Sequence, residues 1–354
     1  MKIKELQSAL RKRKIAGSLF INTSSSSENP HITYFTGYTG VGVLYVPAAK
    51  SPSLFVPRME RERAAKGMVK NIRELDKKKL FDCLQNRALR KKAKIGIDPA
   101  ALSLASYQSM RKNLKKASFA NISRELQELR AVKTYKELLI IKKAFWHANR
   151  IYEKTLRQFS DFKIETDVAA YMEYESRKLG LELSFPVIIA SGKNASMPHH
   201  HPQPQKLQRG LCVIDFGIRY KNYCTDMTRT VGIGTLSTKE KNEHASLLRI
   251  QKSLAADVHE NETGHSLYKK AVWLLGEKSR YFTHGLGHGI GVEIHESPSL
   301  SPNSKDIIKN GMVLTIEPGV YLPGKYGIRI EDSIIVSEKA RVLTTPSKEL
   351  MAVK

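Results

Sequence analysis

Four acidic residues and one histidine lie in short apolar segments in the second half of this 354-residue chain. The acids are Asp215, Asp226, Glu317 and Glu331, and the histidine is His288. An unpaired carboxylate inside an apolar strand is costly, so these acids need a partner. Carboxylates together with an imidazole form a suitable ligand set for a pair of divalent metal ions. The five residues therefore predict a dinuclear metal site.

The two aspartates lie on the arms of a predicted β-hairpin. Residues 213–220 are mostly apolar and residues 223–231 are rich in threonine, which is typical of two strands joined by a tight turn. Antiparallel partners have a constant index sum, so a two-residue loop at Tyr220-Lys221 sets Asp215 directly opposite Asp226. Like charges at that distance repel each other unless a cation lies between them. The hairpin therefore predicts a metal ion beside both aspartates.

The two glutamates repeat this arrangement further along the chain. A three-residue loop, Pro323-Gly324-Lys325, sets Glu317 opposite Glu331 in a second predicted hairpin. An acidic pair across a single hairpin is more often solvated surface than a metal site. The apolar neighbours of all four acids, together with the imidazole of His288, favour the metal site.

Six motifs, in order along the chain, contain these residues. They are Val213-Ile-Asp215-Phe-Gly217, Thr225-Asp226-Met-Thr-Arg-Thr230, His284-Gly-Leu-Gly-His288-Gly-Ile-Gly291, Ile294-His295-Glu-Ser-Pro298, Thr315-Ile-Glu317-Pro-Gly-Val-Tyr321 and Gly327-Ile-Arg329-Ile-Glu331-Asp332. Together they resemble the motifs of the pita-bread metallopeptidases, and within that group the proline-specific branch of Xaa-Pro aminopeptidases and Xaa-Pro dipeptidases. The resemblance covers residues 131–354, and a fainter one covers the N-terminal part.

The resemblance implies an α+β protein with two domains. Residues 131–354 are expected to form the pita-bread (creatinase/aminopeptidase) catalytic domain, preceded in residues 1–130 by a smaller α/β domain like the N-terminal domain of creatinase and prolidase. The local pattern of the first domain is itself α/β. Its expected helices are residues 2–14, 59–70, 77–92 and 100–113, its expected strands are 18–22, 32–35, 41–47, 53–57 and 94–97, and residues 122–130 are expected to connect to a long helix over 133–159.

The resemblance also implies how the ligands divide between two metal ions. Asp215 is expected on one ion, His288 and Glu317 on the other, and Asp226 and Glu331 on both. Hard oxygen ligands favour Mn²⁺, with Co²⁺ or Zn²⁺ as alternatives.

Further residues receive roles by the same resemblance. His199 is expected near the scissile carbonyl, and His284 and His295 are expected behind the metal ligands. His295 and His199 are expected to donate hydrogen bonds to the oxyanion. Glu317 is expected to carry a proton to the leaving nitrogen. Arg329 is expected to orient Glu331 or to sense a substrate carboxylate.

The register at His199 is open, because three histidines follow one another in His199-His-His201. His199 is the choice because it directly follows Pro198.

These features predict a hydrolase that cleaves the peptide bond before proline, as an Xaa-Pro aminopeptidase. An Xaa-Pro dipeptidase, or prolidase, is the first alternative. A non-catalytic member of the fold that binds RNA or a ribosome is a second, although such members tend to lose ligands. Methionine aminopeptidases usually separate the last two glutamate ligands by more than the interval from Glu317 to Glu331, and metal-free creatinase-like hydrolases lose the ligand set.

Charge and cysteine content limit the class of protein. The formal net charge is +25, and residues 1–130 hold 27 Lys and Arg against 10 Asp and Glu. Basic clusters such as Lys77–Lys79 lack interleaved aromatic residues, so a solvated basic face is expected rather than a nucleic-acid interface.

No membrane span is expected. Three cysteines, Cys83, Cys212 and Cys224, suit a reducing cytoplasm as buried apolar groups. The expected partners are proline-containing peptides and a second copy of the chain in a homodimer.

Overall fold

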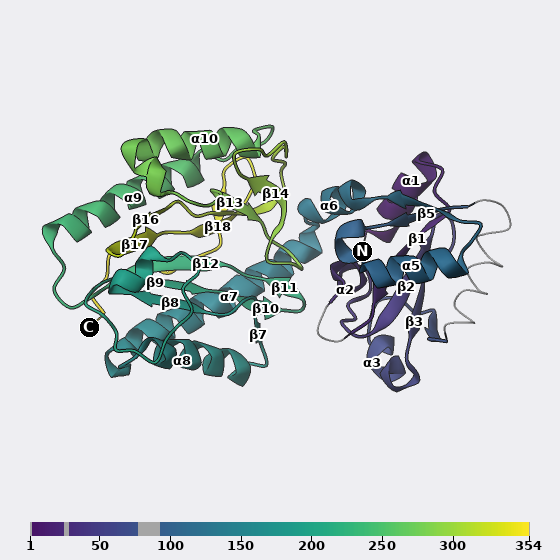
Figure 1. The fold of residues 1–354 in the computed structure, drawn as a ribbon, viewed down its shortest axis with the longest axis horizontal. Helices are drawn as coiled ribbons and strands as arrows, with labels where there is room; N and C mark the ends of the chain where they lie inside the picture. Colours follow the sequence, from purple (N-terminus) through teal and green to yellow (C-terminus); the bar gives the residue numbers. More distant parts are fainter. Residues whose placement is uncertain (1, 25–27, 77–92, 354) are drawn as a thin grey trace. The chain divides into compact units, whose positions relative to one another are not determined.

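A computed structural model describes residues 2–24, 28–76 and 93–353 of the chain. The chain divides into two compact units, Met1–Leu129 and Arg130–Lys354 (Figure 1). The helix expected over residues 77–92, the Lys77–Lys79 cluster and Cys83 lie outside the described residues. Within the described ranges, no helix is both long and apolar enough to cross a membrane.

The first unit is built on one mixed sheet with the strand order β4-β3-β2-β1-β5-β6. Its apolar core lies between the sheet and the helices. The strands are β1 (Gly17–Asn22), β2 (Gly42–Pro47), β3 (Ser53–Val56), β4 (Ile72–Glu74), β5 (Lys94–Ile97) and β6 (Ser118–Asn121), and the helices are α1 (Ile3–Lys12), α2 (Pro30–Thr36), α3 (Arg61–Ala65), α5 (Leu104–Asn113) and α6 (Ser123–Ala131). This is the α/β pattern that the sequence predicts.

One expected strand, residues 32–35, is wrong, because these residues belong to helix α2. The side chain of Asn29 caps the helix by accepting a hydrogen bond from the backbone N–H of His31. Pro30 occupies the first helical position, where its missing N–H costs nothing. Gly37 ends the helix in the left-handed region at φ 71°. These start and stop signals outweigh the strand propensity of the β-branched and aromatic residues between them.

The expected connection over residues 122–130 is also helical, because it forms α6. The next helix, α7 (Tyr135–Arg157), falls within the long helix expected over 133–159. A capping box starts it: the Thr134 hydroxyl accepts from the Glu137 N–H, and the Glu137 carboxylate accepts from the Thr134 N–H.

The second unit has strands in its interior with helices on both sides (Figure 1). Helices α7 and α8 (Glu165–Lys178) cover one side, and α9 (Thr238–Ala256) and α10 (Gly264–Leu275) cover the other. The strand orders are β11-β10-β7, β12-β9-β8, β14-β13-β15-β18-β19 and β16-β17. The strands are β7 (Glu182–Leu183), β8 (Ile188–Ser191), β9 (Gly210–Phe216), β10 (Ile218–Tyr220), β11 (Tyr223–Cys224), β12 (Met227–Ile233), β13 (Gly287–Gly289), β14 (Glu296–Leu300), β15 (Val313–Ile316), β16 (Gly319–Leu322), β17 (Tyr326–Arg329), β18 (Asp332–Ile335) and β19 (Arg341–Val342).

The register of the first hairpin differs from the expectation by two residues. Its turn is Lys221-Asn222 rather than Tyr220-Lys221, and both turn residues have positive φ, 48° and 69°. Asparagine tolerates this conformation well, which favours the shifted turn. Asp215 consequently lies opposite Thr228, not Asp226. Because a shift of two keeps the alternation of side chains, Asp215 and Asp226 still share one face.

The register of the second hairpin is as expected. Leu322 pairs with Tyr326 across Pro323-Gly324-Lys325, and Ile316 pairs with Asp332. Glu317 and Glu331 therefore occupy matching positions between these paired segments.

Strand β12 meets the second hairpin side by side. The backbone N–H of Glu331 donates to the carbonyl of Thr228 at 3.1 Å. The Thr230 hydroxyl donates to the Arg329 carbonyl at 2.8 Å and accepts from the Arg329 N–H at 3.2 Å. These bonds bring the acidic residues of both hairpins to the same place.

Candidate metal centre

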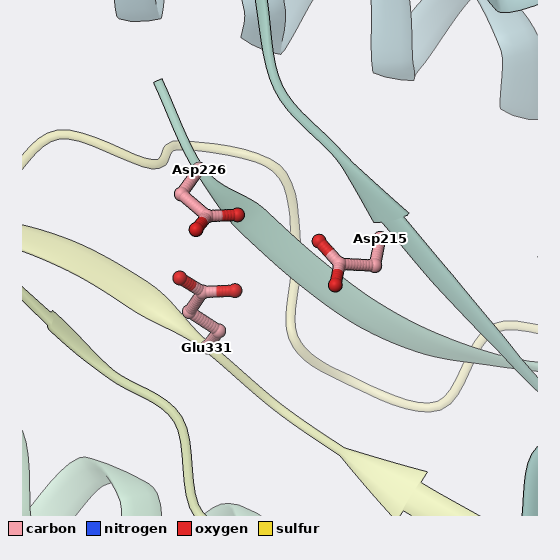
Figure 2. Close-up of side chains that lie close together, drawn as sticks. All are labelled: Asp215, Asp226 and Glu331. Carbon is pink, nitrogen blue, oxygen red and sulfur yellow. The ribbon is translucent and has the colours of Figure 1, made fainter. Parts of the chain in front are cut away.

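Three carboxylates from separate segments converge in the second unit (Figure 2). Asp215 comes from β9, Asp226 directly precedes β12, and Glu331 lies between β17 and β18. One oxygen from each lies within 4.8 Å of the others, and all three residues are buried. Carboxylates this close and this poorly solvated need a positive charge nearby.

His288 and Glu317 complete the cluster. The imidazole Nε2 of His288 lies 3.5 Å from Asp226 Oδ2 and 3.5 Å from Glu317 Oε1. Its Nδ1 lies 3.0 Å from the carbonyl oxygen of Gly289. Since a carbonyl can only accept, Nδ1 donates to it, and in that tautomer the lone pair of Nε2 faces the carboxylates.

Two threonines hold this set in place. The Thr315 hydroxyl donates to Glu317 Oε1 at 3.3 Å and accepts from the His288 N–H at 3.0 Å. The Thr228 hydroxyl donates to Glu331 Oε2 at 2.8 Å. A side chain at Gly287 would place its Cβ 2.0 Å from the carbonyl oxygen of Thr315, so only glycine allows β13 to approach β15 this closely.

The cluster perturbs the acidity of its members. Burial raises the pKa of Asp226 well above its usual range, and the charges of Asp215 and Glu317 raise it further. Burial, followed by the charges of Asp226, Glu317 and Asp215, raises the pKa of Glu331 in the same way. Burial also raises the pKa of Glu317, against the opposing effect of His288 and Arg329. Without cations, these groups retain protons at pH values where carboxyls normally lose them.

The residues fit a pair of divalent metal ions. Asp215 Oδ1 and Glu331 Oε1 are buried and have no hydrogen-bond donor among the described residues. Such oxygens are costly unless a cation or a proton meets them. Together with the lone pair of His288, they supply the mixed oxygen and nitrogen ligands that Mn²⁺, Co²⁺ or Zn²⁺ accept.

Arg329 lies directly behind Asp215. Its Nη2 donates to Asp215 Oδ2 at 2.5 Å, its Nε to the Thr228 hydroxyl at 3.0 Å, and its Nη1 to the Tyr321 hydroxyl at 2.8 Å and the Pro198 carbonyl at 3.1 Å. The side chain is 4% exposed. The expectation paired Arg329 with Glu331 or a substrate carboxylate, whereas the structure pairs it with Asp215. Glu331 is reached only through the shared hydroxyl of Thr228.

His284 has both ring nitrogens engaged. Nδ1 donates to the carbonyl of Gly285 at 2.7 Å, so in the neutral ring Nε2 accepts from the Tyr321 hydroxyl at 2.8 Å. Burial, with the charge of Arg329, lowers the pKa of His284 to about 4, which keeps the ring neutral. His284 is thus linked to Arg329 through Tyr321, consistent with its expected place behind the ligands.

The three successive histidines have different surroundings. His200 is buried, and its Nε2 lies 2.7 Å from Glu165 Oε2. His199 is exposed, and its charge contributes to lowering the pKa of both His284 and His295. His199 therefore lies on the side of the metal centre, while His200 anchors the segment to Glu165. This supports the choice of His199.

His295 lies beside His288, with ring centroids 4.3 Å apart in a T-shaped arrangement. Burial, followed by the charges of His288 and His199, lowers the pKa of His295 to about 4. No hydrogen bond from its imidazole to another described residue is present in the structure. A neutral ring with unused nitrogen atoms next to the cluster is available to a ligand.

Sequence reasoning missed three supporting residues: Thr228, Tyr321 and Glu165. Thr228 follows Asp226 by two positions, so strand alternation alone places both on one face. Tyr321 ends a motif already singled out, but nothing in the sequence shows its link to His284. Glu165 accepts hydrogen bonds from residues 191–203, a segment that is remote from Glu165 in sequence. The donors are Ser191, Asn194, His200 and Gln203.

The raised carboxyl pKa values predict how stability depends on pH. A carboxyl with a higher pKa in the folded protein stabilises the fold below its unfolded pKa of about 4.3, and this contribution is lost as pH rises through the raised value. The metal-free protein should therefore lose stability as the pH rises above about 4.3, and Glu331→Gln should flatten this dependence, with a gain at neutral pH of about 1–3 kcal/mol. Thermal unfolding in EDTA measures both effects.

The exposed substitution Glu349→Gln serves as the matched control, because this side chain is 69% exposed. Parallel pH curves for the wild type and Glu331→Gln would contradict the proposed repulsion.

Both parts of the chain are similar to known protein families. Residues 140–338 match the model of metallopeptidase family M24, and residues 2–132 match the creatinase/prolidase N-terminal domain. The Xaa-Pro dipeptidase of Pyrococcus furiosus is 33% identical over 91% of this chain and 92% of its own length. The X-Pro aminopeptidase of Thermotoga maritima superposes with a TM-score of 0.90 at 29% identity, covering 99% of both chains. The prolidase of Pyrococcus horikoshii gives 0.90 at 30% identity with the same coverage.

These matches confirm the two-part α+β fold and the resemblance drawn from the six motifs. The chain belongs to metallopeptidase family M24.

Proposed function

We propose that this chain hydrolyses the peptide bond before proline, and that Xaa-Pro dipeptides are its main substrates. The observation that carries the proposal is the cluster of Asp215, Asp226, Glu331, Glu317 and His288, with two buried oxygens that no described donor reaches. The names of relatives similar over more than nine-tenths of the chain support the choice of bond.

The metal ligands are proposed as the sequence divides them: Asp215 for one ion, His288 and Glu317 for the other, and Asp226 and Glu331 for both. Two divalent ions bound there would supply Lewis-acid activation of water and of the scissile carbonyl. Asp226 lies close to Asp215 and Glu331 on one side and to His288 on the other, which supports its central position.

Some of the remaining residues contact the substrate, and others orient the residues of the site. His295 and His199 donate N–H hydrogen bonds to the carbonyl oxygen as its negative charge develops. A pKa of about 4 keeps His295 a neutral donor at neutral pH. Glu317 takes a proton from the attacking water and passes it to the leaving nitrogen. Arg329 orients Asp215, and His284 supports Arg329 through Tyr321.

Proline explains why a dedicated enzyme is needed. The bond before proline is a tertiary amide without an N–H, so an enzyme cannot use a hydrogen bond from that nitrogen to recognise the bond. The ring is also rigid, and a pocket of fixed shape recognises it at a low cost in entropy.

Aminopeptidase action on longer Xaa-Pro peptides is the second candidate. It is the activity that the sequence analysis named first, and the structural similarity to the X-Pro aminopeptidase of Thermotoga maritima supports it. We further propose Mn²⁺ as the metal, a homodimer as the assembly and the cytoplasm as the compartment. The free, buried thiols of Cys212 and Cys224 support a reducing compartment.

A small substrate panel tests the function and separates the two candidates. The full-length protein with Mn²⁺ is assayed on Ala-Pro, Ala-Pro-Ala and Ala-Ala. A dipeptidase cleaves Ala-Pro with the highest kcat/KM, an aminopeptidase favours Ala-Pro-Ala, and both leave Ala-Ala nearly intact. Equal cleavage of Ala-Ala would overturn specificity for proline.

Asp226→Asn tests the proposed ligation. A ligand shared by both ions affects both when it is weakened, so bound Mn²⁺ should fall and hydrolysis of Ala-Pro should decrease by roughly 10³-fold or more. Asp257→Asn, at a partly exposed ion pair with Lys270, should change neither. Metal content and initial rates are measured on the same samples, and normal turnover with metal retained in Asp226→Asn would rule out the site.

His295→Ala tests the role of the neutral imidazole. Both ions should remain bound while kcat falls by roughly 10²-fold, because removing one oxyanion donor costs a few kcal/mol in the transition state. KM should change little, since the interaction forms as the charge develops. Steady-state kinetics on Ala-Pro give both constants, and an unchanged kcat would assign His295 a structural role only.

A further inference from the structure

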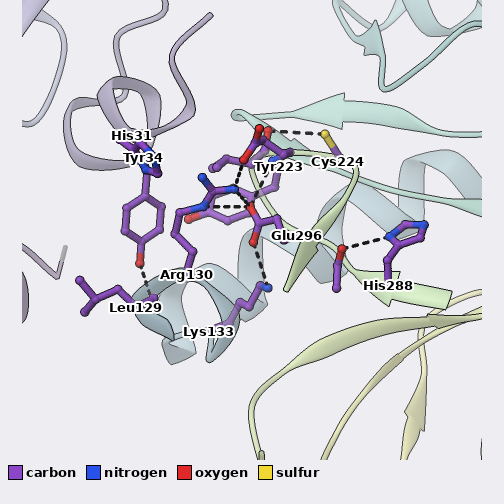
Figure 3. Close-up of polar contacts among 12 residues, drawn as sticks. His31, Tyr34, Leu129, Arg130, Lys133, Tyr223, Cys224, His288 and Glu296 are labelled. Atoms are coloured by element: carbon purple, nitrogen blue, oxygen red, sulfur yellow. Dashed lines mark hydrogen bonds and ion pairs between the residues drawn. The ribbon is translucent and has the colours of Figure 1, made fainter. Parts of the chain in front are cut away.

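A second cluster of buried charges lies beside the metal centre in the second unit. It contains Arg130, Lys133 and Glu296, with side chains that are 7%, 1% and 3% exposed. Figure 3 shows Arg130 and Lys133 converging on Glu296, which directly follows His295 in the chain. None of the three belongs to the proposed ligands.

Both carboxylate oxygens of Glu296 are engaged. Arg130 donates to Oε1 from Nε at 3.2 Å and from Nη2 at 2.7 Å, and the backbone N–H of Glu293 donates to the same oxygen at 3.1 Å. Lys133 Nζ lies 3.4 Å from Oε2. Arg130 Nη2 also contacts the more exposed carboxylate of Glu293. We call Arg130, Lys133 and Glu296 the Glu296 clamp.

The carboxylate of Glu296 in the clamp is ionised. Burial alone would raise the pKa of Glu296, but the positive charges of Arg130 and Lys133 bring it below its usual range. A buried ion pair gains little stability over well-packed apolar residues of the same volume, because desolvation offsets the attraction. What such a pair does provide is a fixed geometry, since an arginine binds a carboxylate in few orientations.

The geometry that the clamp fixes is that of the segment preceding β14. Residues 291–295 lie between β13 and β14 and belong to neither strand, and the imidazole of His295 has no hydrogen bond to another described residue. Tethers from the β10–β11 hairpin hold the beginning of the segment: the Cys224 N–H donates to Gly291 O at 2.7 Å, and Arg219 Nη1 to Val292 O at 2.7 Å. The Glu296 clamp holds its end.

The carboxylate of Glu296 also packs against the segment itself. A Cβ at Gly291 would lie 2.4 Å from Glu296 Oε2 and 2.6 Å from its Oε1. The backbone at Gly291 therefore closes over the carboxylate without room for a side chain. Moving Glu296 must move the segment that carries His295.

We propose that Arg130 and Lys133 are positioning residues that set the orientation of the His295 imidazole through Glu296. This inference rests on the proposed role of His295 as the donor to the oxyanion. It adds a residue pair, remote in sequence from the six motifs of the metal centre, to the reaction.

A double-mutant cycle on kcat tests the inference in the full-length protein with Mn²⁺. Arg130→Lys keeps the charge but loses the two-nitrogen grip, so kcat on Ala-Pro should fall by roughly 10- to 100-fold, as expected for a small misplacement of a reacting group. In the His295→Ala background the same substitution should change kcat by less than about 2-fold, because no imidazole remains to be positioned. KM and Mn²⁺ content should stay close to wild type in both backgrounds.

Two further variants serve as a control and as a substitute for Arg130→Lys. Arg209→Lys changes an exposed two-nitrogen arginine–glutamate contact, with Glu240, in which neither residue belongs to the six motifs, and should leave kcat unchanged. Glu296→Gln, which keeps an acceptor oxygen, should reproduce the loss if Arg130→Lys fails to fold. An equal fold-loss with and without His295, or no loss in a folded Arg130→Lys protein, would overturn the inference.

A readout without turnover separates this inference from the proposed function. The imidazole C–H resonances of His295, identified by their absence in His295→Ala, should shift in Arg130→Lys and stay in place in Arg209→Lys. If the wild type cleaves no Xaa-Pro peptide but the shift occurs, the proposed function fails while the clamp stands. If the wild type is active and the resonances do not move, the clamp is wrong.

Discussion

Mutual repulsion among buried carboxylates is the constraint on which the second unit depends. Asp215, Asp226 and Glu331 have oxygens within 4.8 Å of one another, and Glu317 joins them across His288. The fold must hold these groups together before any cation arrives, and the raised pKa values of Asp226, Glu317 and Glu331 record the cost. Protons offset that cost in the metal-free protein, and divalent ions offset it in the loaded one.

Rigid strand pairing makes such an arrangement possible. Glu331 is fixed by its backbone bond to Thr228, and Arg329 by two bonds to the hydroxyl of Thr230. Because side chains alternate along a strand, a slip of one residue in β9 or β12 would turn an aspartate out of the cluster. The threonines of β12 therefore both join the two hairpins and determine which side chains meet.

The sequence predicted most of what strand alternation and motif spacing can determine. It placed the glutamates correctly opposite each other, and it put the aspartates on one face even though the turn at Lys221-Asn222 shifts their pairing by two. It missed helix α2, whose capping by Asn29 and Gly37 outweighs local propensity. It did not predict the ion pair of Arg329 with Asp215, because this contact depends on how two hairpins pack, which no spacing along the chain encodes.

Burial shifts the pKa values of the histidines around the cluster in the opposite direction from those of the carboxylates. Burial lowers the pKa of His284 and His295 to about 4, so both rings are neutral at neutral pH. Proton exchange on metal binding is therefore assigned to Asp226, Glu317 and Glu331, while the imidazoles keep one N–H each. Separate partners fix the imidazoles: Tyr321 holds His284, Gly289 holds His288, and the Glu296 clamp holds the segment carrying His295. The carboxylates thus carry the changes of charge in the cluster, while His284 and His295 keep a neutral ring with a hydrogen to donate.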